Sequence, residues 1–331
     1  MDYINIGKVK IAKTLALAPM AGVADRPFRR LCMEYGASYC VSEMVSSKGL
    51  CYSDRKTEAL CTITSLERPC AIQLFGCEPE YMAKAVKLIL PYSPDIIDIN
   101  MGCPVPKVAN NGSGSALMKD IPLAMDIIKA VKSETDLPVT IKMRIGWNEN
   151  SINALEFANA MEKAGVDAIA VHGRTREQYY SGKANWEVIK QVKQSSSIPI
   201  IGNGDVFTLQ DCLSMYSTTN CDLVMVGRGA YGNPFLFKEV RCYFNEEQYT
   251  PPTIQERMDV MLYHIRLILQ NSVSEEVGIK LARKHSAWYM TGLYGSAKFR
   301  SRCYSLSSYQ DAVTLAKDFV ALQKEHFGES I

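Results

Sequence analysis

The chain has 331 residues, of which 47% are apolar and 22% charged, the ordinary balance of a globular protein. This balance argues against a disordered chain, and the lack of any run of about 18 apolar residues argues against a membrane protein. The net charge is only +2, so nucleic-acid binding would need a local basic patch. The eleven cysteines form no Cys-x-x-Cys pair and no zinc-spaced cluster, so we expect reduced thiols, no metal site and a cytoplasmic location.

The chain opens with a predicted hairpin, because Ile4, Ile6, Val9 and Ile11 alternate with polar residues around a Gly7-Lys8 turn. Eight short apolar runs follow at an interval of roughly 25 to 35 residues, which is typical of buried strands. These runs cover residues 15–19, 38–44, 70–75, 96–100, 139–143, 168–172, 198–202 and 223–227.

Helical patterns lie between most of these runs. Apolar residues recur at three- and four-residue steps over residues 26–35, 79–90, 122–133, 152–164, 186–194 and 208–216. Residues 55–60 form a weaker candidate in the second gap. Eight strands that alternate with helices predict an α/β fold, a closed (β/α)8 TIM barrel, whose usual length is about 250 residues. An open doubly wound sheet is the alternative, although it rarely needs eight such regular units.

The last part of the chain has a different pattern. We expect the barrel to end near Val240 and to be followed by a polar connector, 244–252, that closes with two prolines. From Thr253 onward the periodicity is purely helical. The sequence therefore predicts a barrel domain over residues 1–242 and a helical domain over residues 243–331.

The segment 95–120 carries the first chemical signal. An apolar strand ends at Asn100, and Cys103 follows in a turn in which Pro104 and Pro106 are expected to prevent immediate re-entry into a helix. Loops at strand ends carry the chemistry of α/β folds. A thiol has an unperturbed pKa of about 8.5, so Cys103 could act as a general acid, or as a nucleophile if its pKa were lowered. A buried, inert cysteine is the alternative.

Two glycine-rich loops follow the last two predicted strands. They are Gly202-Asn203-Gly204-Asp205 and Gly227-Arg228-Gly229. Loops at these two positions form the usual phosphate site of such barrels, so we expect a cofactor with a phosphate group.

Other side chains at the strand ends suit a flavin. Lys142 would place a cation near the ring, unless it is only a lysine at an exposed strand tip. His172 could likewise be functional or structural. Gln73 could form a hydrogen bond with the ring edge, and Met20 could pack on its face.

A basic stretch lies in the helical region. Residues 278–302 contain no Asp or Glu, but contain the cations Lys280, Arg283, Lys284, Lys298, Arg300 and Arg302. The aromatic side chains His285, Trp288, Tyr289, Tyr294 and Phe299 lie among them. Basic and aromatic residues together favour a nucleic-acid surface over a merely solvated helix face. Arg174, Arg176 and Lys183 would extend this patch.

Taken together, these motifs resemble the tRNA-dihydrouridine synthases, most closely the bacterial B subgroup. The resemblance covers nearly the whole chain. It is carried by Ala18-Pro19-Met20-Ala21-Gly22-Val23, Gln73-Leu74-Phe75-Gly76, Asn100-Met101-Gly102-Cys103-Pro104, Lys142-Met143-Arg144, His172-Gly173-Arg174-Thr175-Arg176 and the two glycine-rich loops.

The resemblance implies an FMN enzyme that reduces uridines in tRNA with NADPH as electron source. It implies FMN contacts from Pro19, Met20, Ala21, Gln73, Lys142, His172, Asn203, Gly204, Asp205, Gly227 and Arg228. It implies Cys103 as the catalytic acid, with Asn100 near the uracil. The tRNA contacts would come from Arg174, Arg176, Arg283, Lys284, Lys298 and Arg300, and no obligate protein partner is expected.

Two other functions stay open at this point. An FMN oxidoreductase of free pyrimidines, similar to dihydroorotate dehydrogenase, would use the same barrel but would not need the basic helical region. An RNA-binding protein with the barrel as a scaffold would leave Cys103, Lys142 and His172 unexplained.

Overall fold

The computed structural model describes residues 1–328. These residues form two compact units, residues 1–228 and residues from Gly229 onward. The boundary falls before helix α10 (Phe235–Phe244), whereas the sequence pattern predicted it near residue 242.

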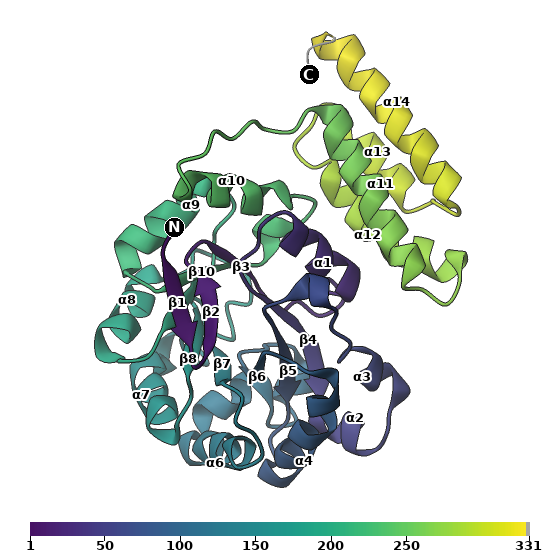
Figure 1. Ribbon diagram of the computed structural model, residues 1–331. Coiled ribbons are helices and arrows are strands. Elements are labelled where there is room, and N and C mark those ends of the chain that lie inside the picture. The colour runs from purple at the N-terminus through teal and green to yellow at the C-terminus, as the bar shows by residue number, and fades with distance from the viewer. Residues whose placement is uncertain (329–331) are drawn as a thin grey trace. The chain divides into compact units, whose positions relative to one another are not determined.

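The first unit is a closed barrel of eight parallel strands (Figure 1). In barrel order the strands run β10-β3-β4-β5-β6-β7-β8-β9. Their bounds are β3 Leu15–Leu17, β4 Cys40–Ser46, β5 Cys70–Phe75, β6 Ile96–Met101, β7 Val139–Arg144, β8 Ala168–His172, β9 Ile200–Asn203 and β10 Leu223–Val226. The TIM barrel predicted from the sequence is confirmed, and the open doubly wound sheet is excluded.

The barrel helices form the outer layer. They are α1 Arg26–Glu34, α2 Ser47–Cys51, α3 Arg55–Ala59, α4 Pro79–Ile89, α5 Pro106–Ala109, α6 Ile121–Lys132, α7 Ala154–Ala164, α8 Trp186–Ser195 and α9 Leu209–Thr219. In this layer α4 packs on α2 and α6, and α6, α7, α8 and α9 pack in this order. The short α2 and α5 were not predicted. Helix α5 begins at Pro106, which contradicts the expectation that this proline keeps the chain out of a helix. Proline is tolerated in the first helical turn, where its missing N–H has no partner to lose.

The amino-terminal end of the barrel is closed. The predicted hairpin, β1 (Tyr3–Ile6) and β2 (Val9–Ala12), buries Ile6 and Ile11 in one cluster with residues at the start of the strands, such as Ala71 and Ala168. Three aspartates also tie neighbouring strands together here. Asp95, Asp167 and Asp222 accept hydrogen bonds from the first backbone N–H of β5, β7 and β9, at 2.7 to 2.8 Å. A ligand can therefore reach the barrel only at its carboxyl-terminal end.

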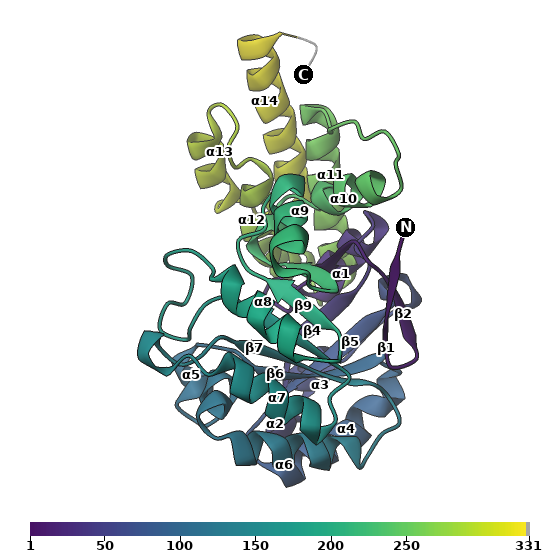
Figure 2. The ribbon, with the colours of Figure 1, turned by 90° about the vertical axis from the view of Figure 1, so that its left-hand side faces the viewer.

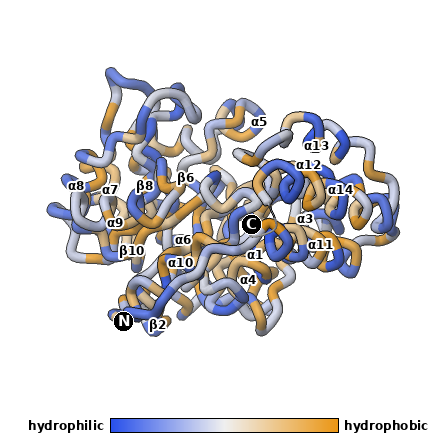
Figure 3. The backbone as a smooth tube through the Cα atoms, turned by 90° about the horizontal axis from the view of Figure 1, so that it is seen from above, coloured by the Kyte–Doolittle hydropathy of each residue, from blue (hydrophilic) through white to orange (hydrophobic). Residues whose placement is uncertain are grey.

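The second unit is helical, as predicted. It contains α10, α11 (Ile254–Gln270), α12 (Glu275–Tyr289), α13 (Ser296–Cys303) and α14 (Tyr309–Phe327). Helices α11 and α14 lie side by side in Figure 2, and α12 packs on α11. Seen from above, α13 is one of the more hydrophilic segments of this unit (Figure 3). Among the described residues, none of the helices combines the length and the apolar composition that a membrane span requires.

Candidate active site

The strand register brings the predicted functional residues to one end of the barrel. Asn100 on β6 pairs with Lys142 on β7, and Arg144 on β7 pairs with His172 on β8. His172 in turn pairs with Asn203 on β9. All of them lie in the carboxyl-terminal half of their strands, so four consecutive strands present polar side chains toward the open end.

Cys103 lies just past β6 in a loop that is fixed at both ends. Its backbone N–H donates to Asn100 Oδ1 at 2.9 Å, and its carbonyl oxygen accepts from Ser115 Oγ at 2.9 Å. The side chain is half-buried. Burial raises the pKa of the Cys103 thiol, although the Val105 N–H and the charges of Arg144 and Lys142 oppose this shift. The thiol is therefore protonated at neutral pH and suits an acid better than a nucleophile.

Gly114 holds this loop at close range. It has a φ of +61°, and a Cβ atom at this position would lie 3.0 Å from the Cys103 carbonyl oxygen and 3.1 Å from Cys103 Cβ. Only glycine combines this backbone conformation with such a close approach.

Lys142 extends along the inner surface of the barrel toward its opening. Its Nζ donates to Asn203 Oδ1 at 3.0 Å, and Asn203 Nδ2 donates to the Met225 carbonyl oxygen at 2.8 Å. Burial, together with the nearby charge of Arg144, lowers the pKa of Lys142 to about 8. The ammonium group is thus charged at neutral pH but close to titration. It is not a lysine at an exposed strand tip.

His172 is buried, with 8% of its surface exposed. Burial lowers its pKa well below the usual value, and the charges of Lys142, Arg144, Arg174 and Arg228 lower it further. The imidazole is therefore neutral at physiological pH and can offer one N–H donor.

Gln73 does not point freely into the opening. Its Nε2 donates to Asp98 at 2.6 Å, and its Oε1 accepts from Asn100 Nδ2 at 2.8 Å. The carboxamide therefore links β5 to β6, and one N–H remains for another acceptor.

Arg144 was not singled out as a site residue, although it belongs to the Lys142-Met143-Arg144 motif. It is buried, and burial lowers its pKa to about 10. Its Nε donates to the Gly102 carbonyl oxygen, and its Nη1 donates to the carbonyl oxygens of Thr175 and Tyr179. The Cys103 loop is thereby tied to the loop after β8. The sequence signal that could have identified Arg144 is an arginine at the end of an apolar strand, where a charged side chain is rarely buried without a role.

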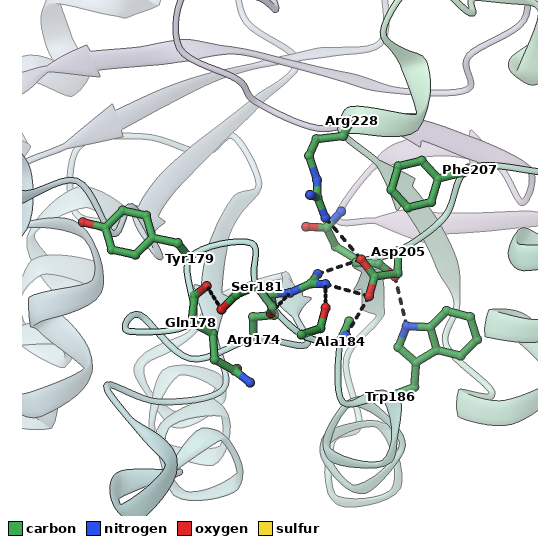
Figure 4. A network of polar contacts seen from close by, with 12 residues as sticks. Arg174, Gln178, Tyr179, Ser181, Ala184, Trp186, Asp205, Phe207 and Arg228 are labelled. Carbon is green, nitrogen blue, oxygen red and sulfur yellow. Dashed lines mark hydrogen bonds and ion pairs between the residues drawn. The ribbon is translucent and has the colours of Figure 1, made fainter. Parts of the chain in front are cut away.

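The loop after β9 is organised around Asp205 (Figure 4). Its carboxylate accepts from Arg174 Nη2 at 2.8 Å, from Arg228 Nη2 at 3.2 Å and from the Ala184 N–H at 2.7 Å. Burial alone would raise the pKa of Asp205, but these hydrogen bonds and the two cations lower it overall. The carboxylate is therefore ionised.

The backbone beside Asp205 has an unusual conformation. Gly204 has a φ of +125°, and a Cβ there would lie 2.8 Å from the Ala184 Cβ. Asp205 itself has a φ of +56°. Next to this loop, Met20 Sδ lies 3.5 Å from the position of a Gly227 Cβ, which brings the loops after β3 and β10 together. Pro19 is half-buried and Ala21 is exposed in the first of these loops.

Arg174 was expected to contact RNA, but its side chain faces the protein interior. It is 1% exposed, and besides Asp205 it donates to the carbonyl oxygens of Ser181 and Gly182. We therefore assign it to holding the loops after β8 and β9.

Arg176 lies closer to solvent. Its guanidinium is 4.5 Å from the centre of the Trp147 ring, and Lys119 Nζ is 3.9 Å from the same ring. Within the described chain neither cation forms an ion pair with a carboxylate. These residues come from the loops after β6, β7 and β8, the same loops that surround Cys103.

The basic stretch of the helical unit is less uniform than its sequence suggested. Arg283 donates to the Leu306 carbonyl oxygen and so has a structural role, while Lys284 is half-buried. Lys298 is exposed and Arg300 is half-buried on α13. Three of the interleaved aromatic side chains belong to the core, since His285, Tyr289 and Phe299 are at most 6% exposed. They cannot stack on bases as expected, because packing within the unit covers them.

Comparison with known proteins decides the family. Residues 16–326 match the model of the family described as dihydrouridine synthase. The chain belongs to the dihydrouridine synthase family. Among its relatives, a probable tRNA-dihydrouridine synthase of Rickettsia bellii is 40% identical over 97% of this chain and 95% of that protein. A tRNA-dihydrouridine synthase B of Pseudomonas aeruginosa is 37% identical over 97% of both chains.

Solved structures support the fold of this dihydrouridine synthase family member. Morphinone reductase, in complex with tetrahydroNAD, has a TM-score of 0.55 and 12% identity, over 73% of this chain and 90% of that one. An old yellow enzyme homologue from Zymomonas mobilis has a TM-score of 0.55 and 14% identity, over 77% and 95% of the two chains. At such low identity the likeness shows the fold alone.

Proposed function

We propose that this chain is a tRNA-dihydrouridine synthase that reduces the 5,6 double bond of uridines in tRNA, with FMN as cofactor and NADPH as electron source. One observation carries the proposal beyond family membership: a protonated thiol, Cys103, is held in place at the open end of the barrel, beside the Lys142–Asn203 pair.

The residues present fit FMN. Gly204 admits no larger side chain without a close contact with Ala184, and Gly227 leaves the backbone beside it uncovered by a side chain of its own, which suits the approach of a phosphate group. Arg228 adds a cation whose guanidinium is half-exposed. Lys142, Asn203 and the remaining N–H of Gln73 offer donors for the carbonyl groups of a flavin ring. When bound, the reduced flavin supplies hydride to carbon 6 of the uracil.

The chain's own residues supply the rest of the chemistry. Cys103 donates its proton to carbon 5, since its raised pKa keeps the thiol protonated until the base binds. Arg144 and Lys142 favour the thiolate that remains, because both cations act on this sulfur. Asn100 fixes the Cys103 backbone, and we propose that it also lies near the bound uracil.

The substrate must leave its base stack to enter the barrel, as in other enzymes that modify bases. Lys119 and Arg176 both lie against the Trp147 ring, and this pair of cations suits the phosphates on either side of the extruded uridine. We propose that Lys298 and Arg300 on α13 hold another part of the tRNA. Because tRNA is the proposed substrate, we propose that the protein acts in the cytoplasm.

The test is to digest total tRNA from a strain that lacks the gene and to measure dihydrouridine at each position by mass spectrometry. We expect dihydrouridine to disappear from at least one tRNA position and to return when the gene is restored. Unchanged dihydrouridine at every position, together with reduction of free uracil or orotate by the purified protein, would favour the free-pyrimidine alternative.

A further inference from the structure

A continuous chain of hydrogen bonds crosses the inner surface of the barrel and ends at Cys103. Thr140 Oγ1 and Gln73 Nε2 both donate to Asp98, each at 2.6 Å. Gln73 Oε1 accepts from Asn100 Nδ2 at 2.8 Å. Asn100 Oδ1 then accepts from the backbone N–H groups of Gly102 at 3.2 Å and of Cys103 at 2.9 Å.

The direction of this hydrogen-bond chain, that is, which group donates and which accepts at each step, follows from the chemistry of its members. An ionised carboxylate can only accept hydrogen bonds, so Gln73 must turn its NH2 group toward Asp98 and its oxygen toward Asn100. Asn100 must then turn its own NH2 group toward Gln73 and its oxygen toward the Cys103 loop. Each amide has two orientations of similar shape, and the groups at the two ends require the same one: the carboxylate at one end, and the N–H groups of Gly102 and Cys103 at the other.

Asp98 is an expensive residue to keep at this position. It is 3% exposed and, within the described chain, forms no ion pair. Burial raises the pKa of Asp98, while the hydrogen bonds from Gln73 and Thr140 and the charge of Lys142 lower it again. An asparagine would fill the same space without an unpaired buried charge. The charge therefore calls for a functional explanation.

We infer that Asp98 is a positioning residue for the reaction at Cys103: it fixes the orientation of Gln73 and Asn100, and through them the backbone of the proton-donating loop. The inference rests on the proposed function, because it concerns the thiol that serves that reaction. Within residues 1–328, the side-chain hydrogen bonds of Asp98 go to Gln73 and Thr140 and not to Cys103 or its loop.

The variant Asp98→Asn tests whether the carboxylate sets the direction of these hydrogen bonds. Asparagine keeps the shape of the side chain but can also donate, so it no longer forbids the arrangement in which Gln73 and Asn100 are both turned around. In the reversed chain Asn100 would present its NH2 group to the Cys103 N–H, and the loop would lose both hydrogen bonds. Full-length, flavin-loaded protein is reduced with NADPH under anaerobic conditions and mixed with unmodified tRNA. Flavin reoxidation is then followed by its visible absorbance.

We expect reoxidation by tRNA to slow at least about tenfold in Asp98→Asn, which corresponds to about 1.4 kcal/mol for the lost hydrogen bonds. The rate of flavin reduction by NADPH should be unchanged, because that step does not use Cys103. Thr140→Val is the matched control: it removes the other hydrogen bond to the same carboxylate but leaves the direction of the chain intact. Its reoxidation rate should stay within about threefold of wild type.

A double variant, Asp98→Asn with Gln73→Glu, moves the carboxylate, which can only accept, one step along the hydrogen-bond chain, from residue 98 to residue 73. Glu at position 73 would again force Asn100 to turn its oxygen toward Cys103, so the rate per bound flavin should recover at least about threefold over Asp98→Asn. A purely structural role for Asp98 would show no such recovery, and the absence of recovery would overturn the inference.

Two further results separate the possible failures. Wild-type protein that transfers nothing to tRNA would refute the proposed function, whereas equal rates for wild type and Asp98→Asn would refute only the role of Asp98. Neutron diffraction of the wild-type protein tests the assigned direction of the hydrogen bonds even if the variants do not fold. We expect deuterium on the Gln73 side-chain nitrogen facing Asp98, and the opposite amide orientation would contradict the inference.

Discussion

At the scale of single residues, the charge of Lys142 should control the affinity for FMN. Its pKa of about 8 means that the ammonium group is charged below this pH and neutral above it. A flavin ring whose carbonyl groups accept from Lys142 favours the charged form, so affinity should fall as pH rises through about 8, by roughly threefold to tenfold between pH 7 and 9. Fluorescence titration with FMN measures this.

The control is Lys142→Met, which keeps the length of the side chain but cannot titrate. This variant should bind FMN more weakly at pH 7 and show a flat profile. A profile that falls equally in the variant would mean that another group is responsible, for example Cys103 or Arg144, which also face Lys142.

Asp205 should contribute to stability as well as to cofactor binding. Asp205→Asn removes the charge that pairs with the guanidinium of Arg174, which is 2% exposed. Leaving a buried cation unpaired costs about 3 kcal/mol of the free energy of unfolding. Urea denaturation measures the loss. Asp126→Asn is the control, since its partner Lys129 is exposed and the pair is worth less than about 1 kcal/mol. Equal losses would rule out the buried pair as the cause.

At the scale of elements, the segment after β6 depends on Gly114. Gly114→Ala places a Cβ against the Cys103 carbonyl oxygen at 3.0 Å and strains a backbone with a φ of +61°. Gly182→Ala has nearly the same φ, +63°, but nothing within 4 Å of the new atom. We expect each to lose about 1 kcal/mol from backbone strain. Only Gly114→Ala should also lose dihydrouridine formation, by about tenfold, as measured by mass spectrometry.

Most elements of the barrel could be predicted from the sequence, and the exceptions have physical reasons. Runs such as Ile96, Ile97 and Ile99 identify a buried strand, and Pro79 marks the start of α4. Helix α2 escaped notice because five residues are too few to show a helical period. Helix α5 was missed because Pro106 was interpreted as a breaker, not as a first-turn residue.

The site was predictable in its residue types but not in its contacts. Cys103, Lys142 and His172 could be identified because each is a reactive side chain at a strand end. The link from Asp98 through Gln73 to Asn100 depends on the register of β5 and β6, which no local pattern encodes. The charge of Arg174 led to the prediction that it lies on the RNA-binding surface. Its partner, Asp205, follows another strand, so no local pattern indicates that the two side chains pair.

At the scale of the whole molecule, the helical unit should add affinity for tRNA without affecting the flavin. Lys298→Glu with Arg300→Glu should lower the slope of log affinity against log salt concentration by roughly one to two, since two phosphate contacts are lost. Filter binding at several salt concentrations measures this.

The matched control for this pair is Lys129→Glu with Lys163→Glu, which makes the same change in net charge on the barrel helices α6 and α7. The control should leave the salt slope unchanged. Loss of FMN together with tRNA in the α13 variant would indicate damage to folding, and equal slopes in both variants would remove α13 from the tRNA surface.

The central claim is that the Cys103 thiol protonates the uracil, and its most direct test compares two thiols at the same end of the barrel. Flavin-loaded wild type, Cys103→Ala and Cys77→Ala are supplied with unmodified tRNA and NADPH, and dihydrouridine is counted by mass spectrometry. Cys77 is also half-buried, in the loop after β5. We predict that Cys77→Ala matches wild type, while Cys103→Ala forms dihydrouridine at least about 100-fold more slowly but still oxidises NADPH. Dihydrouridine formation by Cys103→Ala at the wild-type rate would contradict the account.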